Sequence, residues 1–297
     1  MWYRTRREQA RENRNREAAE LKIGFIGLGA MGGRLAARLT GVGELTVFDA
    51  SERAMKPFSG RASLGSSIAE AGTEADVVGV CVRTDAQVGD CVDALLPVMK
   101  RGSVLMIHST VSPDNVKAAA KRAEAYAITV IDAPVTVTRY DGADAPFVCM
   151  MIGGGHAADE RTKPQLEACA TDVVHVGPLG SAMSLKIINN LVSLVQIIVA
   201  EEAFRLAALT GVPAEALQTV MKSNGALTPT MMAIASRAGQ PPADEHTAAL
   251  RSVQASNGVK DLALAEALAK SVDTASASAT FAKSQYWFSY TANLPNR

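Results

Sequence analysis

Residues 22–33 read KIGFIGLGAMGG, and this stretch decides the fold. A short apolar run with β character leads into glycines and a helical pattern, and residues 44–49 (ELTVFD) form a second apolar run. Strand, turn, helix and strand within ~30 residues is the length of a βαβ unit. In a dinucleotide-binding turn, Gly27 permits the tight turn, Gly29 lets the backbone approach a pyrophosphate, and Gly32 lets helix and strand pack closely.

An acidic residue ends the second strand, as this kind of site requires. Asp49 lies twenty residues after Gly29, where its carboxylate accepts hydrogen bonds from the adenosine ribose and repels a 2′-phosphate. We therefore expect NAD rather than NADP, although Arg53 lies near enough to soften the preference. Val82 and Arg83 end a later strand on the cofactor side. The expected cofactor-binding turn consists of Gly27, Leu28, Gly29, Ala30, Met31 and Gly32.

The rest of the chain divides into an α/β part and a helical part. Alternation of strands and helices predicts a Rossmann-like domain over residues 21–180 with a largely parallel, buried sheet. Beyond Gly180 only helices are expected, so residues 181–297 form an all-α C-terminal domain joined by a long helix. The further strands are expected at 76–82, 103–108, 128–132, 147–153 and 173–177, and the helices at 85–97, 112–126, 158–169, 181–210, 213–223, 229–238, 244–256, 258–272 and 274–290.

Composition excludes several classes of function. The 30 basic residues balance the 30 acidic ones among 297, and only 5% are aromatic, so neither nucleic acid nor an anionic membrane is an expected partner. The four cysteines and four histidines show no metal-ligand spacing, so no metal site is expected. The cysteines are typical of reduced thiols in a cytoplasmic protein.

Residues 1–20 hold six arginines and four glutamates and almost nothing apolar after Tyr3. They lack the apolar segment of a secretory signal and are too acidic for a mitochondrial presequence. They are interpreted as a charged extension outside the fold. A start codon placed too early and a partner-binding arm are the alternatives.

The helix at 181–210 carries polar groups in an apolar run. Lys186, Asn189 and Asn190 interrupt it, which argues against a membrane span. Lys186 and Asn190 are spaced i and i+4, so they share one helical face, and Asn189 lies close to it. A lysine partly desolvated beside a cofactor cleft has a lowered pKa and suits proton transfer to or from an alcohol. The alternative is a lysine that covers apolar neighbours and reaches solvent.

Four further motifs stand in a fixed order after the glycine-rich turn. They are HSTVSP (108–113), DAPV (132–135), GPLG (177–180) with Lys186 and Asn190 following, and GVKDL (258–262). With Gly27–Gly32, they make the chain resemble the β-hydroxyacid dehydrogenase family, which includes 3-hydroxyisobutyrate dehydrogenase and tartronate semialdehyde reductase and, more distantly, 6-phosphogluconate dehydrogenase. The resemblance covers roughly residues 22–290.

This resemblance implies a function and roles for particular residues. It implies an NAD(P)-dependent oxidoreductase that interconverts a β-hydroxy acid and its semialdehyde or keto form, acting as a homodimer or homotetramer. Lys186 would be the general acid/base and Asn190 the catalytic residue that holds the substrate beside it. Lys260 matches a lysine at the nicotinamide end, and Ser109 and Thr110 match a loop against the nicotinamide ribose. The substrate carboxylate would be wrapped by the segment 132–138, and the expected substrate-binding residues are Ser109, Thr136, Val137, Thr138, Arg139 and Asn189.

The substrate segment departs from the family. Two glycines that usually follow the DAPV motif are replaced by Val137 and Thr138, whose Cβ atoms hinder close approach of a carboxylate to the backbone. Arg139 either replaces the lost amides with a bidentate contact or points to solvent. His108 stands where an acid is common, and is either a titrating group or a hydrogen-bonded strand-end residue. Ala182 replaces a glycine before Lys186.

Two other functions stay open. A reductase of another carbonyl compound or of an imine would keep the fold. Imine reductases resemble this family but usually lack the catalytic lysine, so Lys186 argues against an imine substrate. A non-catalytic nucleotide-binding scaffold would have no need of Lys186, Asn190 and Lys260.

Overall fold

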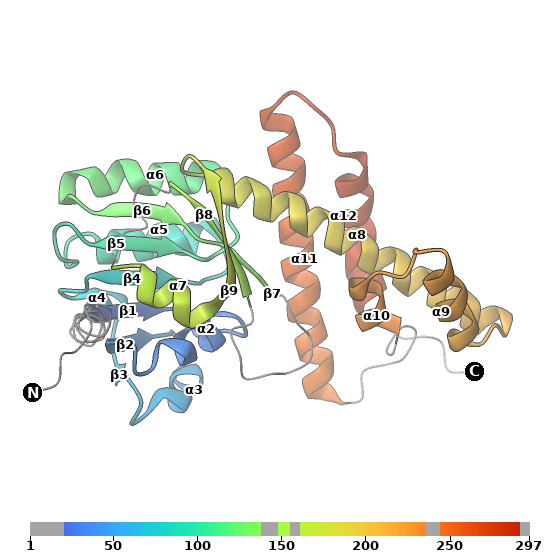
Figure 1. The fold of residues 1–297 in the computed structure, drawn as a ribbon, viewed down its shortest axis with the longest axis horizontal. Coiled ribbons are helices and arrows are strands. Elements are labelled where there is room, and N and C mark those ends of the chain that lie inside the picture. Colours follow the sequence, from blue (N-terminus) through green and yellow to red (C-terminus); the bar gives the residue numbers. More distant parts are fainter. Residues whose placement is uncertain (1–20, 138–147, 155–160, 236–243, 292–297) are drawn as a thin grey trace, which may run out of the picture. The chain divides into compact units, whose positions relative to one another are not determined.

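The structure, a computed structural model, describes residues 21–137, 148–154, 161–235 and 244–291, the last five of these by their backbone alone. The chain forms two compact units, Met1–Lys186 and Ile187–Arg297. Their border falls within the long helix α8 (Ser181–Thr210), so the first residues of that helix belong to the α/β unit. Figure 1 shows the twisted sheet of the first unit and the helices that make up the second.

The first unit is built on a nine-stranded sheet among the described residues, in the order β3-β2-β1-β4-β5-β6-β8-β7, with β9 also paired to β8. The six strands from β3 to β6 are parallel to one another. Their carboxyl ends therefore meet at one edge, where ligands bind in such sheets. The strands are β1 Lys22–Ile26, β2 Glu44–Phe48, β3 Ser63–Leu64, β4 Val77–Val80, β5 Val104–Ile107, β6 Thr129–Asp132, β7 Val135–Val137, β8 Val148–Gly153 and β9 Ala170–Gly177.

Helices cover both faces of this sheet, and each face has its own apolar core. Alternate residues of one strand enter different cores: Met106 of β5 packs with α2 and α7, whereas Leu105 packs with α5 and α6. Central parallel strands need this burial on both faces, which explains their nearly continuous apolar sequences. The helices are α2 Gly32–Leu39, α3 Glu52–Met55, η1 Lys56–Phe58, α4 Ile68–Gly72, α5 Asp85–Leu95, α6 Pro113–Ala123, η2 Glu124–Tyr126 and α7 Lys163–Cys169.

The predicted α/β fold is confirmed, but the far end of the sheet differs from a buried parallel arrangement. β8 runs antiparallel to β6 and β7, because β7 follows β6 after a two-residue break and β8 then returns beside both. β9 is the edge strand and is mostly exposed, not buried as its apolar sequence suggests. The short strands β3 and β7 were not expected from the sequence, since neither exceeds three residues.

The second unit is helical throughout its described residues. It holds most of α8 together with α9 Ala214–Ser223, α10 Pro229–Ala235, α11 Glu245–Ser271 and α12 Ala277–Thr291. The two helices expected at 244–256 and 258–272 are one continuous helix, α11. Gly258 does not break this helix. Its lack of a side chain makes room for the ring of Tyr286 from α12, which occupies the position that a Cβ would take. The glycine serves helix packing rather than chain reversal.

By length and composition, α8 is the one helix in the described part of the chain that could cross a membrane. Lys186, Asn189, Asn190 and Gln196 interrupt its apolar run, and each would be costly in a bilayer. Only 22% of its most apolar window is buried within the chain. Much of the helix therefore exposes apolar side chains to solvent, and exposed apolar surface of this kind marks an interaction site.

Candidate active site

The glycine-rich turn between β1 and α2 has the geometry of a dinucleotide-binding loop. Gly27 has φ +89°, and a Cβ there would lie 2.4 Å from the carbonyl oxygen of Cys81. A Cβ on Gly32 would lie 2.0 Å from the carbonyl oxygen of Gly27. Gly29 is exposed and has open space beside it, with no heavy atom within 4 Å of the position of a Cβ. The outer glycines therefore shape the turn, and the middle one leaves its outer surface open to a phosphate.

Asp49 binds this turn from the end of β2. Its Oδ2 accepts the backbone N–H of Leu28 at 2.6 Å, and its Oδ1 accepts that of Ser51 at 2.8 Å. Each carboxylate oxygen keeps a second lone pair, so two ribose hydroxyls can still donate to it. A pocket of about 310 Å³ lies at this edge, lined by Ile26, Gly27, Gly29, Phe48, Asp49, Ala50, Ile68, Cys81, Val82, Arg83, Gln87, Asp90 and Cys91.

A larger pocket of about 560 Å³ lies at the opposite edge of the sheet, beside the first residues of β1 and β2. Its place argues against a role as the cofactor site, because ligands of open α/β sheets bind outside the carboxyl ends of the strands. The smaller pocket adjoins the glycine-rich turn and an acid that can bind ribose. It is therefore the better candidate for the cofactor, despite its size.

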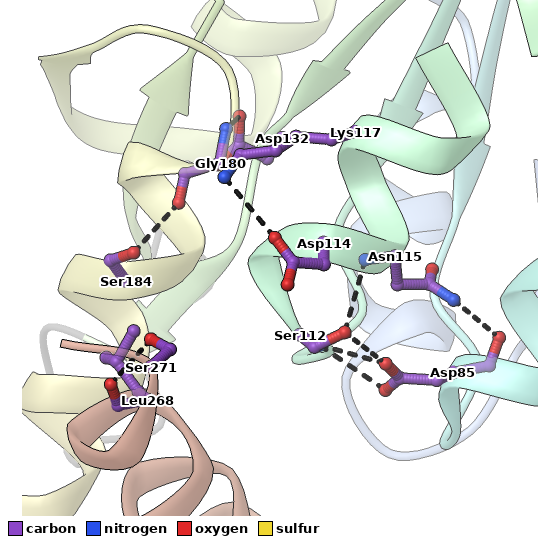
Figure 2. Close-up of polar contacts among 10 residues, drawn as sticks. All are labelled: Asp85, Ser112, Asp114, Asn115, Lys117, Asp132, Gly180, Ser184, Leu268 and Ser271. Carbon is purple, nitrogen blue, oxygen red and sulfur yellow. Dashed lines mark hydrogen bonds and ion pairs between the residues drawn. The ribbon is translucent and has the colours of Figure 1, made fainter. Parts of the chain in front are cut away.

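The loops after β4 and β5 are joined by hydrogen bonds. The Ser109 hydroxyl accepts the N–H of Val82 at 2.8 Å and is buried. Ser112, which caps α6, donates from its hydroxyl to Asp85 in the first turn of α5 at 2.6 Å (Figure 2). These bonds hold two helix N-termini together at the carboxyl edge of the sheet. Arg83 is exposed at this edge.

Thr110 follows Ser109 and is half-buried. In this loop the side chain of Thr110 is therefore partly accessible to solvent, whereas the Ser109 hydroxyl is buried. Both predicted residues lie at the carboxyl end of β5, beside Val82 at the end of β4.

His108 is a structural histidine at the end of β5. Its Nδ1 lies 2.8 Å from the carbonyl oxygen of Ala133, and its ring stacks on Phe25 with centroids 5.8 Å apart. Burial lowers the pKa of His108 from 6.5 to about 4, against a smaller opposing effect of the bond to Ala133. The imidazole is therefore neutral at physiological pH, which excludes a titrating role there.

Lys186 lies near the start of α8 and is buried, with 9% of its surface exposed. The beginning of this helix is attached to the sheet by Asp132. Both oxygens of that carboxylate accept backbone N–H groups, Oδ1 from Gly180 at 2.9 Å and Oδ2 from Met183 at 2.8 Å. Asp132 begins the segment that the family resemblance assigns to the substrate carboxylate, but its own side chain bonds to α8.

The next part of that segment forms β7, beside β8. Thr136 and Val137 are half-buried, and Thr136 is the cross-strand partner of Cys149. Burial raises the pKa of the Cys149 thiol; Asp172 raises it further, and Lys186 opposes the rise. Lys186 is therefore within electrostatic range of the β7–β8 pair. Thr138 and Arg139 lie outside the described residues.

The second unit places three polar side chains together. The Asn190 amide donates to Asp261 Oδ2 at 2.8 Å, and the Lys260 ammonium lies 2.8 Å from Asp261 Oδ1. The Lys260 contact is an ion pair whose angle does not meet hydrogen-bond geometry, since Oδ1 has no hydrogen-bond partner. A carboxylate only accepts, so the Asn190 amide nitrogen must face it and leave the amide oxygen as an acceptor elsewhere.

Asp261 belongs to the GVKDL motif, but the sequence predicted no role for it. The signal that points to it is its place directly after Lys260, since a half-buried ammonium or amide group needs an acceptor. Asn189 is half-buried on α8, one residue before Asn190. No group of three metal-binding side chains occurs among the residues that the structure describes.

Comparison with known proteins identifies the family. Residues 22–177 match the NAD binding domain of 6-phosphogluconate dehydrogenase. A probable 3-hydroxyisobutyrate dehydrogenase of Mycobacterium bovis is 33% identical over 67% of this chain and 68% of its own. The chain belongs to the β-hydroxyacid dehydrogenase family. An uncharacterized oxidoreductase of Mycobacterium tuberculosis is also 33% identical, over 84% of this chain and 87% of its own.

A solved structure gives the same result for this β-hydroxyacid dehydrogenase family member. The 3-hydroxyisobutyrate dehydrogenase of Mycobacterium tuberculosis with L-serine superposes with a TM-score of 0.76, at 26% identity, over 93% of this chain and 96% of its own. The chain is thus an oxidoreductase with a dinucleotide-binding domain and a helical C-terminal region. Membership in this family accounts for the glycine-rich turn at the start of the dinucleotide-binding domain.

Proposed function

We propose that this protein is an NAD-dependent dehydrogenase or reductase that interconverts a small β-hydroxy acid and its semialdehyde or keto acid. Lys186 is the general base when the alcohol is oxidised and the general acid when the carbonyl is reduced. The observation that carries the proposal is a buried lysine one turn before Asn190 on α8, in a chain with a dinucleotide-binding turn.

The division of labour follows from the chemistry. When bound, the nicotinamide supplies the hydride acceptor or donor, so the protein need only handle the proton and align the substrate. Lys186 Nζ removes or returns the proton of the substrate hydroxyl. Its burial keeps water from competing for that proton. General acid–base catalysis of this kind contributes about 10² to 10⁴-fold in rate.

Asn190 holds the hydroxyl in line for that transfer. Its amide nitrogen is committed to Asp261, so its amide oxygen is the group that accepts from the substrate. Lys260, which we assign to the nicotinamide end of the cofactor, is held by the same carboxylate. Asn189 is the neighbouring amide on α8.

The preference for NAD rests on Asp49. Its carboxylate stands at the end of β2 beside the open Gly29, where it would accept from a ribose diol and repel a 2′-phosphate. Arg53 is exposed on α3, four residues after Asp49, and its guanidinium would attract a phosphate. NADP is therefore the weaker cofactor.

The substrate class follows from the relatives and from the altered segment. Similar proteins are named for 3-hydroxyisobutyrate, and one solved relative contains L-serine, so small β-hydroxy acids are the first class to test. Val137 replaces a glycine of the family pattern and narrows the space for the acid's carboxylate. We expect an acid different from 3-hydroxyisobutyrate to be the best substrate.

A second copy of the chain is the partner that α8 requires. Five large apolar side chains on this helix are about half exposed, and exposed apolar surface of this kind marks an interface. We expect a homodimer or homotetramer in the cytoplasm, with no membrane contact; light scattering of the purified chain after gel filtration tests this. The exposed large apolar residues on α8 are Ile188, Val192, Val199, Leu206 and Leu209.

The test is NADH and NADPH formation across a panel of β-hydroxy acids, including 3-hydroxyisobutyrate and both serine enantiomers. Wild type is compared with Lys186→Ala and with Lys270→Ala, an exposed lysine near the end of α11 that serves as control. The expected result is turnover with NAD that falls by about 10³-fold in Lys186→Ala only. Equal rates in the three proteins would overturn the role of Lys186.

The replacement of two family glycines by Val137 and Thr138 leaves room for a different substrate class. If no acid turns over, a reductase of other carbonyl compounds or imines becomes the better proposal, tested with NADH consumption on ketones and cyclic imines. Tight NADH binding with no turnover on either panel would leave a nucleotide-binding scaffold. Lys186 argues against an imine reductase, and Lys186, Asn190 and Lys260 argue against a scaffold.

A further inference from the structure

The start of α8 is capped from the sheet rather than by its own residues. The carbonyl oxygen of Gly180 accepts both the backbone N–H and the hydroxyl of Ser184, and Figure 2 shows the hydroxyl bond. Gly180 has no side chain with which to cap the turn. The Ser181 hydroxyl is buried without a hydrogen-bond partner, and the first turn contains no acid. Asp132, 48 residues before Gly180, supplies the missing acceptor. A carboxylate is among the preferred caps for the free N–H groups at a helix N-terminus, and its charge is favourable at the positive end of the helix dipole.

The sheet makes room for this carboxylate with a glycine. Gly153 of β8 stands opposite Asp132 in the antiparallel pair, and a Cβ there would lie 2.2 Å from Asp132 Oδ1. The Asp132 side chain has no exposed surface. A buried charge with both oxygens bonded to one helix is a fixed anchor, because any movement would leave it unpaired.

We propose that Asp132 is a positioning residue for Lys186, acting through the first turn of α8; this rests on the proposed function of Lys186. Met183 stands one turn before Lys186, and both belong to the first compact unit. Fixing the N–H groups of Gly180 and Met183 fixes the position and rotation of that turn, and hence the direction of the Lys186 side chain. A misplacement of ~1 Å in a reacting group lowers the rate by about 10²-fold.

The first test is Asp132→Asn, which keeps the shape but turns an amide NH₂ toward one of the two N–H donors. We expect kcat to fall by about 10²-fold while the Kd for NADH stays within about twofold of wild type. Rates are expressed per NADH-binding site, so that unfolded protein does not count. The control is Asp244→Asn, which weakens the exposed aspartate cap of α11, where Thr247 N–H donates at 2.7 Å.

A second variant displaces the carboxylate without removing its charge. Gly153→Ala forces Asp132 to move, and the expected loss in kcat is again about 10²-fold. Gly89→Ala is the matched control, because a Cβ at that helical glycine has no neighbour within 4 Å. Agreement between Asp132→Asn and Gly153→Ala identifies the position of the carboxylate as the cause.

Two further measurements separate positioning from simple stability. In a Lys186→Ala background, Asp132→Asn should leave the residual rate unchanged, since a residue that acts through the lysine has no effect without it. Amide hydrogen exchange over residues 180–186 should quicken in Asp132→Asn and Gly153→Ala but not in their controls.

The proposal is overturned if both variants keep the wild-type kcat per NADH site, or if Asp132→Asn lowers the residual rate of Lys186→Ala by the same factor as that of wild type. Should wild type itself turn over no substrate, the proposed function fails separately. Exchange over residues 180–186 then decides the anchoring: unchanged exchange overturns it.

Discussion

The side-chain amide of Asn190 on α8 donates a hydrogen bond of 2.8 Å to the carboxylate of Asp261 on α11. Lys260 pairs with the other oxygen of the same carboxylate. One acid thus sets the orientation of an amide and holds a cation. Asp261 thus contacts the two residues to which the family resemblance assigns roles, Asn190 in catalysis and Lys260 in cofactor binding.

Removal of Asp261 should therefore impair turnover more than nucleotide binding. We expect Asp261→Ala to lower kcat by about 10²-fold, because Asn190 loses the partner that fixes its amide. A double-mutant cycle with Asn190→Ala should show a coupling of about 1 kcal/mol or more. Glu245→Ala, an exposed acid in the first turn of α11, is the control. Additive effects would mean that the bond does not support catalysis.

Replacement of Asp49 should change the choice of cofactor. In Asp49→Ser the carboxylate that would bind the ribose and hold Leu28 N–H is lost, so kcat/KM with NAD should fall by about tenfold or more. The preference for NAD over NADP should narrow, since the repulsion of a 2′-phosphate is also lost. Measured Kd values for NADH and NADPH check this against Glu52→Gln, an exposed acid of α3. An unchanged ratio would contradict the assignment.

Acid should destabilise the protein through His108. Its pKa is lowered from 6.5 to about 4 by burial, so the unfolded chain binds the proton more readily than the folded one. The stability that depends on the neutral ring is complete above pH ~6.5 and is lost as pH falls toward ~4. Between pH 7 and pH 5 this loss is about 2 kcal/mol.

Urea unfolding at these two pH values, with wild type beside His108→Gln, measures it. Glutamine does not titrate, so the variant should be less stable at pH 7 but show the smaller decrease on acidification. Equal decreases in the two proteins would show that His108 does not carry the effect.

A side chain at Gly258 should destabilise the second unit. A Cβ there would lie 2.1 Å from the Tyr286 ring, so Gly258→Ala must displace that buried ring or separate α11 from α12. We expect a loss of about 2 kcal/mol in the free energy of unfolding. Gly89→Ala, in open space on α5, should instead be neutral or gain up to about 1 kcal/mol from helix propensity. Thermal and urea unfolding of both variants measure these changes. A neutral Gly258→Ala would contradict the close packing of α11 on α12.

Sequence reasoning succeeded where the signal is local. The turn at Gly27 and the bounds of α8 follow from residues close together in the chain. It failed around Gly258, where two helices were expected and one is found. A glycine in a helical pattern is compatible either with a helix end or with close packing of a second helix. Whether it ends the helix or admits a neighbour depends on Tyr286, which is distant in sequence.

The sequence by itself determined the dinucleotide-binding turn, the succession of strands and helices, and the shared face of Lys186 and Asn190. These depend on backbone stereochemistry and on the periods of strands and helices, which a short stretch of chain contains in full. Only the tertiary structure decided the antiparallel direction of β8, the capping of α8 by Asp132 and the bond between Asn190 and Asp261. Each of these pairs a group with a partner far along the chain, and a buried polar group is satisfied by whichever partner the completed fold brings to it.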